Sequence, residues 1–112
     1  MTQTRYQYGT YAERKLIDFL QEASIYAWRS PASKSPVDVY ACDPKRRDFF
    51  AFQVKRVKSI NSVYKQKGER NIKKWVFTAL EEFRNAKLPD WWKRYLAIYC
   101  DDTKEFEIFQ AR

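Results

Sequence analysis

The chain has no histidine and only two cysteines, Cys42 and Cys100, which stand far apart. Zinc sites in proteins are built from cysteine and histidine at short spacings such as C-x-x-C, so this composition excludes a zinc site. A disulfide is allowed by the number of cysteines but is not implied by their spacing. We favour two buried free thiols.

Long apolar segments are also absent. No run approaches the roughly 18 apolar residues that a membrane-spanning helix needs, and no charged start is followed by an apolar signal segment. The chain has 112 residues, 45% of them hydrophobic, and shows no repeats or linkers. That is enough for one core and not for two, so we predict a single domain over residues 1–112 that acts inside the cell without a membrane.

Negative charge is scarce. Twenty-two Lys and Arg face fourteen Asp and Glu, which gives a net charge of +8 that no histidine titration can change. A permanently basic chain suits a polyanionic partner, and nucleic acid is the leading candidate. Aromatic residues make up 18% of the chain, more than a small core requires, so some are available for interfaces or for stacking on bases.

Hydrophobic spacing predicts an α/β domain with the element order α-β-β-β-α-β-β. The third strand has apolar side chains on both faces, as expected for a strand that is covered on both sides. The predicted helices are residues 11–23 and 72–86, and the predicted strands are residues 25–28, 37–41, 49–57, 95–100 and 106–110.

Glu13 occupies an unusual position in the first predicted helix. Leu16 and Leu20 follow it at offsets of three and seven residues, which places its carboxylate on or beside the stripe that faces the core. Two interpretations stay open. Thr10-x-x-Glu13 has the spacing of a capping box at a helix start, or Glu13 belongs to a functional site.

Asp38, Gln53 and Lys55 complete a candidate metal site with Glu13. Gln53 and Lys55 are two residues apart in a strand, so their side chains project from the same face, and Asp38 joins them if the two strands are neighbours. Hydrolysis of a phosphodiester needs oxygen ligands for Mg²⁺ and a lysine that orients water or stabilises developing negative charge. Alternatively, Asp38 is a turn residue and Lys55 an exposed strand cation.

Four segments, in order, carry a family resemblance over residues 9–58. The chain resembles the archaeal Holliday junction resolvases of the PD-(D/E)XK nuclease superfamily in Gly9-Thr10-x-x-Glu13-Arg14, Arg29-Ser30-Pro31-Ala32-Ser33, Pro36-Val37-Asp38-Val39 and Phe52-Gln53-Val54-Lys55. The resemblance implies a restriction-endonuclease-like core, in which helices flank a central mixed β-sheet.

The same resemblance implies a homodimeric endonuclease of DNA recombination and repair that uses Mg²⁺, with Mn²⁺ as a substitute, to nick branched DNA at four-way junctions. It would act in the cytoplasm of an archaeal cell, or belong to an archaeal virus. Glu13, Asp38 and Gln53 would surround the metal and Lys55 would be catalytic. Ser33 would lie near the cleaved strand, and Arg14 and Arg29 would approach phosphate.

Gln53 departs from the family, which usually has glutamate there. Its amide oxygen can still bind Mg²⁺, though less strongly than a carboxylate. We therefore expect lower metal affinity with retained geometry. The alternative is a nuclease that has lost activity and kept only DNA binding.

Basic residues gather next to the candidate site. Between Lys55 and Lys74 there are eight of them against Glu69 alone, a local excess of seven positive charges. Such a run would track phosphates without reading bases, so recognition should depend on DNA shape. The predicted nucleic-acid contacts are Arg14, Arg29, Lys34, Arg56, Lys58, Lys65, Lys67 and Arg70.

Three functions remain open: a junction-resolving endonuclease, a nuclease of the same fold that cuts flaps, single-stranded regions or duplex, and a DNA-binding module without catalysis. For Trp91, Trp92 and Tyr95 we favour core or dimer contacts over base stacking.

Overall fold

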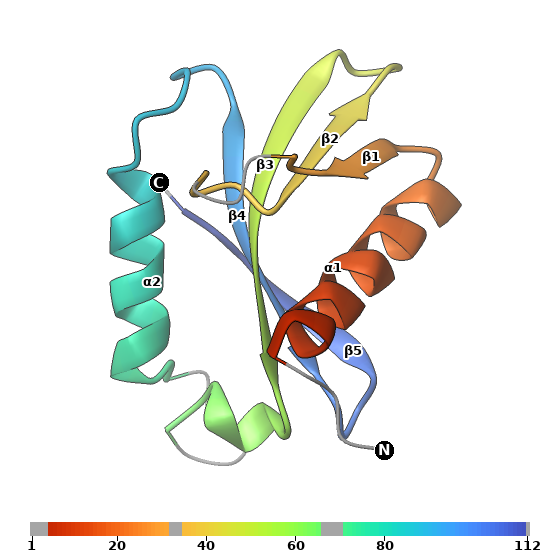
Figure 1. The fold of residues 1–112 in the computed structure, drawn as a ribbon. Coiled ribbons are helices and arrows are strands. Elements are labelled where there is room, and N and C mark those ends of the chain that lie inside the picture. The colour runs from red at the N-terminus through yellow and green to blue at the C-terminus, as the bar shows by residue number, and fades with distance from the viewer. Residues whose placement is uncertain (1–4, 32–34, 66–70, 112) are drawn as a thin grey trace.

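The computed structural model describes the backbone of residues 5–31, 35–65 and 71–111, and the side chains from Thr10 onward within these ranges. Two α-helices flank one sheet (Figure 1). The elements in chain order are α1 (Arg5–Glu22), β1 (Tyr26–Arg29), β2 (Val39–Asp43), β3 (Asp48–Val57), the 3₁₀ helix η1 (Ile60–Ser62), α2 (Lys74–Arg84), β4 (Lys93–Cys100) and β5 (Glu105–Gln110).

The five strands form a mixed sheet in the order β1-β2-β3-β4-β5. All neighbours are antiparallel except β3 and β4, which are parallel and are joined by a crossover through η1 and α2. This arrangement confirms the predicted fold class and element order. Parallel neighbours need such a crossover because a tight turn can join only antiparallel strands.

Each face of the sheet is covered by one helix (Figure 1). Leu16 and Leu20 of α1 pack with Val39, Ala41 and Phe52, and form the core on one face. On the other face, the apolar side of α2 packs on β4 and on the end of β3. The buried residues of α2 are Val76, Ala79 and Phe83. The prediction that β3 is covered on both sides is confirmed, and it explains the two apolar faces of that strand.

The first helix begins at Arg5 and not near Tyr11 as predicted. The residues before Thr10 lack an apolar stripe, and periodicity alone could not detect this helical start. Similarly, α2 begins at Lys74 and not at Ile72, because Ile72 forms an antiparallel bridge with Tyr64. The helix η1 lies between residues 57 and 72, where hydrophobic spacing predicted no helix or strand.

Arg94, in β4, forms hydrogen bonds with the last residues of α2 and with the loop that follows it. Its guanidinium donates hydrogen bonds to the carbonyl oxygens of Phe83, Arg84, Ala86 and Leu88, at 2.7 to 3.0 Å. The last carbonyls of a helix have no partner inside the helix, so a cation at this end satisfies them and complements the helix dipole.

Both cysteines are free thiols, with Cys100 buried and Cys42 half-buried. Burial raises the pKa of the Cys100 thiol to about 11, which keeps it protonated and unreactive. Among the helices in the described part of the chain, none is long and apolar enough to cross a membrane.

Candidate active site

The structure excludes one of the two interpretations of Glu13. Because α1 starts at Arg5, Thr10 lies inside the helix and cannot cap its start, so the capping box is wrong. The Glu13 side chain is 19% exposed, and its Oε1 accepts a hydrogen bond from Nε of Arg29 at 3.0 Å. Glu13 therefore holds a partly buried carboxylate where α1 crosses the end of β1.

Asp38 stands just before β2, between the buried side chains of Val37 and Val39. Its backbone N–H donates to the carbonyl of Phe52 at 2.8 Å, and its Oδ2 accepts a hydrogen bond from the backbone N–H of Val54 at 2.8 Å. The Asp38 side chain thus accepts a hydrogen bond from a backbone N–H of β3 that the backbone of a neighbouring strand would otherwise accept. These two bonds hold the carboxylate against β3.

The pairing of β2 with β3 ends at Val39 and Phe52. In the described part of the chain, residues 53–57 of β3 have β4 on one side and no strand on the other. We call this stretch the open edge. It lets groups from both faces of the sheet meet, since no further strand separates them.

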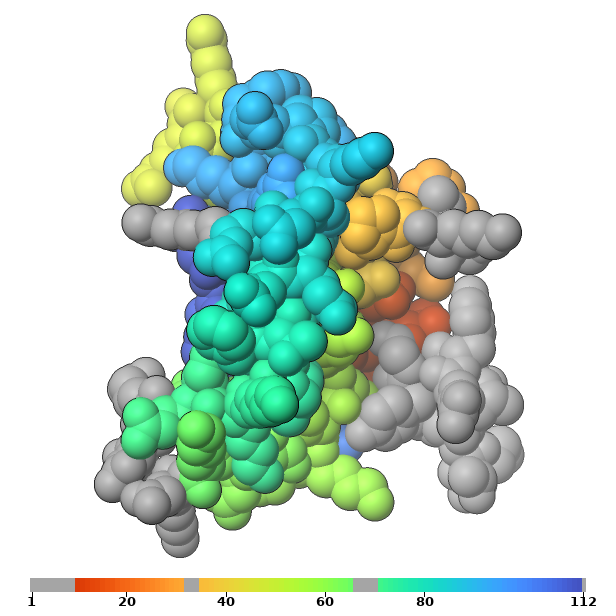
Figure 2. Space-filling view, turned by 90° about the vertical axis from the view of Figure 1, so that its left-hand side faces the viewer, coloured from red at the N-terminus to blue at the C-terminus, as the bar shows by residue number. Residues whose placement is uncertain are grey.

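Gln53 and Lys55 lie on the open edge, on the face that also carries Ala51 and Val57. Gln53 is half-buried and Lys55 is exposed. Among the described residues, Lys55 forms no ion pair, so its ammonium is available to a ligand. On the face shown in Figure 2, the red start of the drawn part of α1, the orange segment before β2 and the yellow-green β3 come together beside α2.

Charge interactions connect Asp38 with Glu13 on one side and with Lys55 on the other. Burial raises the pKa of Glu13 above its ordinary value, the charge of Asp38 raises it further, and Arg29 opposes both effects. Burial also raises the pKa of Asp38, whereas the Val54 N–H and the charge of Lys55 lower it. The Asp38 carboxylate therefore lies near both Glu13 and Lys55, and strand pairing places Gln53 beside Asp38.

The donor set fits a hard divalent cation. Two carboxylates that raise each other's energy and an amide oxygen nearby are ligands that Mg²⁺ accepts, with water completing its shell. No cluster of three or more His, Cys, Asp or Glu suited to a metal occurs in the residues that the structure describes.

The other predicted contacts have different surroundings. Arg14, Lys58 and Lys65 are exposed, whereas Arg29 pairs with Glu13, a partnership that no sequence signal indicated across sixteen positions. Arg56 is paired with Asp101 at 2.8 Å and lies over the Tyr11 ring, and its side chain is 13% exposed. It has little surface to offer a phosphate. Ser33, Lys34, Lys67 and Arg70 lie outside the described residues.

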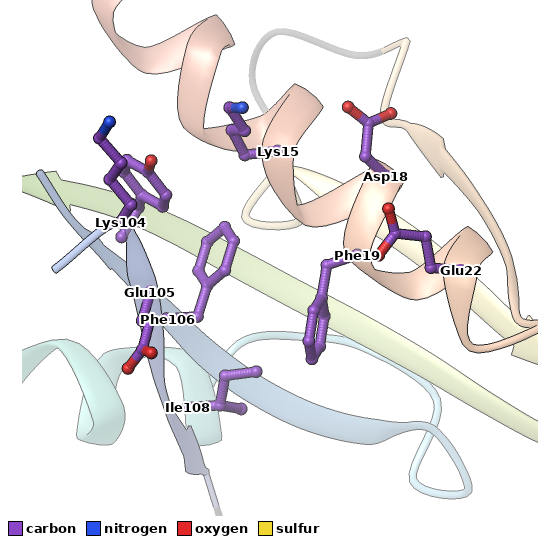
Figure 3. A pocket seen from close by; sticks show the side chains of 9 residues that line it. Lys15, Asp18, Phe19, Glu22, Lys104, Glu105, Phe106 and Ile108 are labelled. Carbon is purple, nitrogen blue, oxygen red and sulfur yellow. The ribbon is translucent and has the colours of Figure 1, made fainter.

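A separate hollow of about 490 Å³ lies between α1 and β5 (Figure 3). Phe19, Phe106 and Ile108 project into it, and charges of both signs surround it. Glu13, Asp38, Gln53 and Lys55 do not line it. The candidate site and this hollow are thus distinct places on the molecule.

No protein-family model matches the chain, and no curated protein matches it. Eight chains of solved structures do match. One is Hjc, a Holliday junction resolvase from the hyperthermophilic archaeon Archaeoglobus fulgidus, at a TM-score of 0.57 and 22% sequence identity over 92% of this chain and 77% of that one. This likeness shows that the chain shares the fold of that protein, including the mixed sheet and flanking helices that the sequence predicted.

Proposed function

We propose that this protein is a divalent-metal-dependent endonuclease that acts on branched DNA, with four-way junctions as its substrate. The observation that carries the proposal is the Asp38 carboxylate bonded to the open edge of β3, where strand pairing puts Gln53 beside it and where its charge acts on Glu13. The fold shared with an archaeal Holliday junction resolvase and the net charge of +8 support it.

Each group has a role that its surroundings support. Glu13, Asp38 and the amide oxygen of Gln53 would hold Mg²⁺, and bound Mg²⁺ supplies polarisation of the phosphate and a more acidic water. The Lys55 ammonium, free of ion pairs among the described residues, would orient the attacking water or stabilise the charge that develops on phosphate. Exposed Arg14, Lys58 and Lys65 would contact the DNA backbone.

Cleavage of a labelled four-way junction in Mg²⁺, compared with linear duplexes of the same sequences, tests the proposal. Lys55→Ala should reduce the rate by about a hundredfold or more while junction binding is retained, because one electrostatic contact to a transition state is worth that much. Lys104→Ala is the matched control, since Lys104 is exposed at the hollow between α1 and β5, away from the candidate site. Equal rates for Lys55→Ala and wild type would remove the catalytic assignment.

Gln53 favours a second candidate, a DNA-binding module without catalysis, because an amide binds Mg²⁺ less strongly than a carboxylate. Under this alternative the wild type binds the junction and does not cut it in Mg²⁺ or Mn²⁺. Equal cleavage of junction and duplex would point instead to a nuclease of broader substrate range.

A further inference from the structure

Five aromatic side chains form a connected cluster, here called the aromatic platform: Trp28, Tyr40, Phe49, Trp91 and Trp92. Tyr40 joins its members, with ring centroids 6.1 Å from Trp28, 6.2 Å from Phe49 and 5.6 Å from Trp92. Phe49 lies 5.7 Å from Trp91 and 4.8 Å from Trp92. Residues from β1, β2, β3 and the loop before β4 thus build one surface.

The platform begins next to the candidate active site. Tyr40 lies two residues after Asp38, which is roughly 7 Å of strand. Trp28 pairs with Tyr40 on the neighbouring strand. Arg29, which follows Trp28 in β1, donates a hydrogen bond to Glu13. On β3, Phe49 projects from the same face as Gln53. A strand held at the site could therefore reach these rings.

Two members are presented to solvent. Trp91 is 69% exposed and Trp28 is 43% exposed, whereas Trp92 is half-buried and packs with Val37 and Phe83. Trp92 anchors the cluster to the core, so the outer rings are held in place before a ligand arrives. Such preorganised flat rings bind with little loss of side-chain freedom.

Charge favours DNA over a second copy of the chain on this surface. The bordering segments, residues 43–48 and 84–94, contain seven Lys and Arg against three Asp. Three of these cations bind other groups of the protein (Arg84, Lys93 and Arg94), and the other four are exposed (Lys45, Arg46, Arg47 and Lys87). Two copies of such a face would bring like charges together, whereas a nucleic acid strand offers phosphates to the cations and bases to the rings. The β2–β3 turn and the loop before β4 border the same side of the molecule in Figure 2.

We propose that the aromatic platform stacks on unpaired nucleobases of the DNA strand that leads to the active site. This inference rests on the proposed function and narrows its substrate to DNA with unstacked bases, such as a branch point or a single-stranded segment. The bases of a duplex are already stacked on one another, so they cannot stack on the rings of the aromatic platform. Stacking is tolerant of sequence because every base has a π face.

Binding of a short oligothymidylate, compared with a duplex carrying the same number of phosphates, tests this site. Fluorescence anisotropy at fixed salt gives both affinities. Trp91→Ala should weaken oligothymidylate binding about tenfold and leave duplex binding within about twofold, because one base loses its stacking partner. Trp91→Phe keeps a ring and should retain most of the affinity. Phe19→Ala, which removes a 51% exposed ring on the other face, should change neither affinity.

If Trp91→Ala lowers the melting temperature, Trp28→Ala serves as a second variant for the same binding test. Unchanged oligothymidylate binding in both alanine variants would overturn the inference, as would an equal loss for oligothymidylate and duplex. If sedimentation shows that either variant turns a dimer into a monomer, the platform is an interface between copies and the inference is also wrong. Neither affinity requires cleavage, so a failed nuclease proposal, tested with Lys55→Ala, is distinguishable from a failed platform.

Discussion

The Asp38 carboxylate accepts a hydrogen bond from the backbone N–H of Val54 at 2.8 Å, in the place where β2 has stopped pairing with β3. This bond satisfies the first donor of the open edge and fixes the carboxylate next to Gln53 and Lys55. The end of the strand pairing and the candidate active site are thus one structural feature. Nuclease chemistry would depend on a sheet that is locally incomplete.

Asp38→Asn should stabilise the protein at neutral pH while abolishing any cleavage. Burial raises the folded-state pKa of Asp38 above its ordinary value of 3.8. The protonated carboxyl group therefore contributes fully to the stability of the fold below about pH 3.8, and this contribution is lost as the pH rises through the folded-state pKa. The amide oxygen can still accept from Val54. Thermal unfolding should show a gain of a few degrees at pH 7 that disappears toward pH 3.8. Asp90→Asn, at an exposed carboxylate, is the control and should show no such gain.

Gln53→Glu should lower stability without metal and lower the Mg²⁺ concentration needed for cleavage. A third carboxylate beside two whose pKa values are already raised adds repulsion in EDTA. The same charge should strengthen metal binding by about tenfold, as expected for one unit charge next to a divalent ion. Melting curves with and without Mg²⁺, and Mg²⁺ titrations of cleavage, measure both effects. Identical titrations for variant and wild type would exclude Gln53 from the metal site.

Arg94→Ala should destabilise the fold by about 3 kcal/mol, because four carbonyls at the end of α2 lose a charged donor. Arg94→Lys should recover less than half of this loss, since an ammonium cannot span the same acceptors. Chemical denaturation gives the free energies of unfolding. Arg84→Ala is the matched control; its exposed pair with Glu81 should cost below about 1 kcal/mol. A comparable loss in the control would remove the special role of Arg94.

Lys58→Ala and Lys65→Ala should each reduce the dependence of DNA binding on salt. Both lysines are exposed in the segment between β3 and α2, and each phosphate contact contributes about one unit to the slope of log affinity against log salt concentration. Affinities over a range of salt concentrations measure this slope. Lys104→Ala lies at the hollow between α1 and β5 and should leave the slope unchanged. An unchanged slope for Lys58→Ala or Lys65→Ala would remove that lysine from the interface.

Local pattern was sufficient for much of the fold. The order of elements, the double coverage of β3 and the shared face of Gln53 and Lys55 follow from spacings of two and of three to four residues, which the sequence displays directly. The position of Asp38 beside Gln53 was predictable for the same reason, since the two residues come from consecutive predicted strands that pair in the structure. Element ends were less accurate, as the start of α2 at Lys74 illustrates.

The sequence by itself determined which side chains could form a site; the tertiary structure decided how they meet. Only the fold revealed that α1 begins before Thr10, that β2 stops pairing at Val39, and that Arg29 binds Glu13. The physical reason is that strand registers and ion pairs join segments many residues apart. Their geometry depends on the packing of the whole core, and no local spacing encodes it.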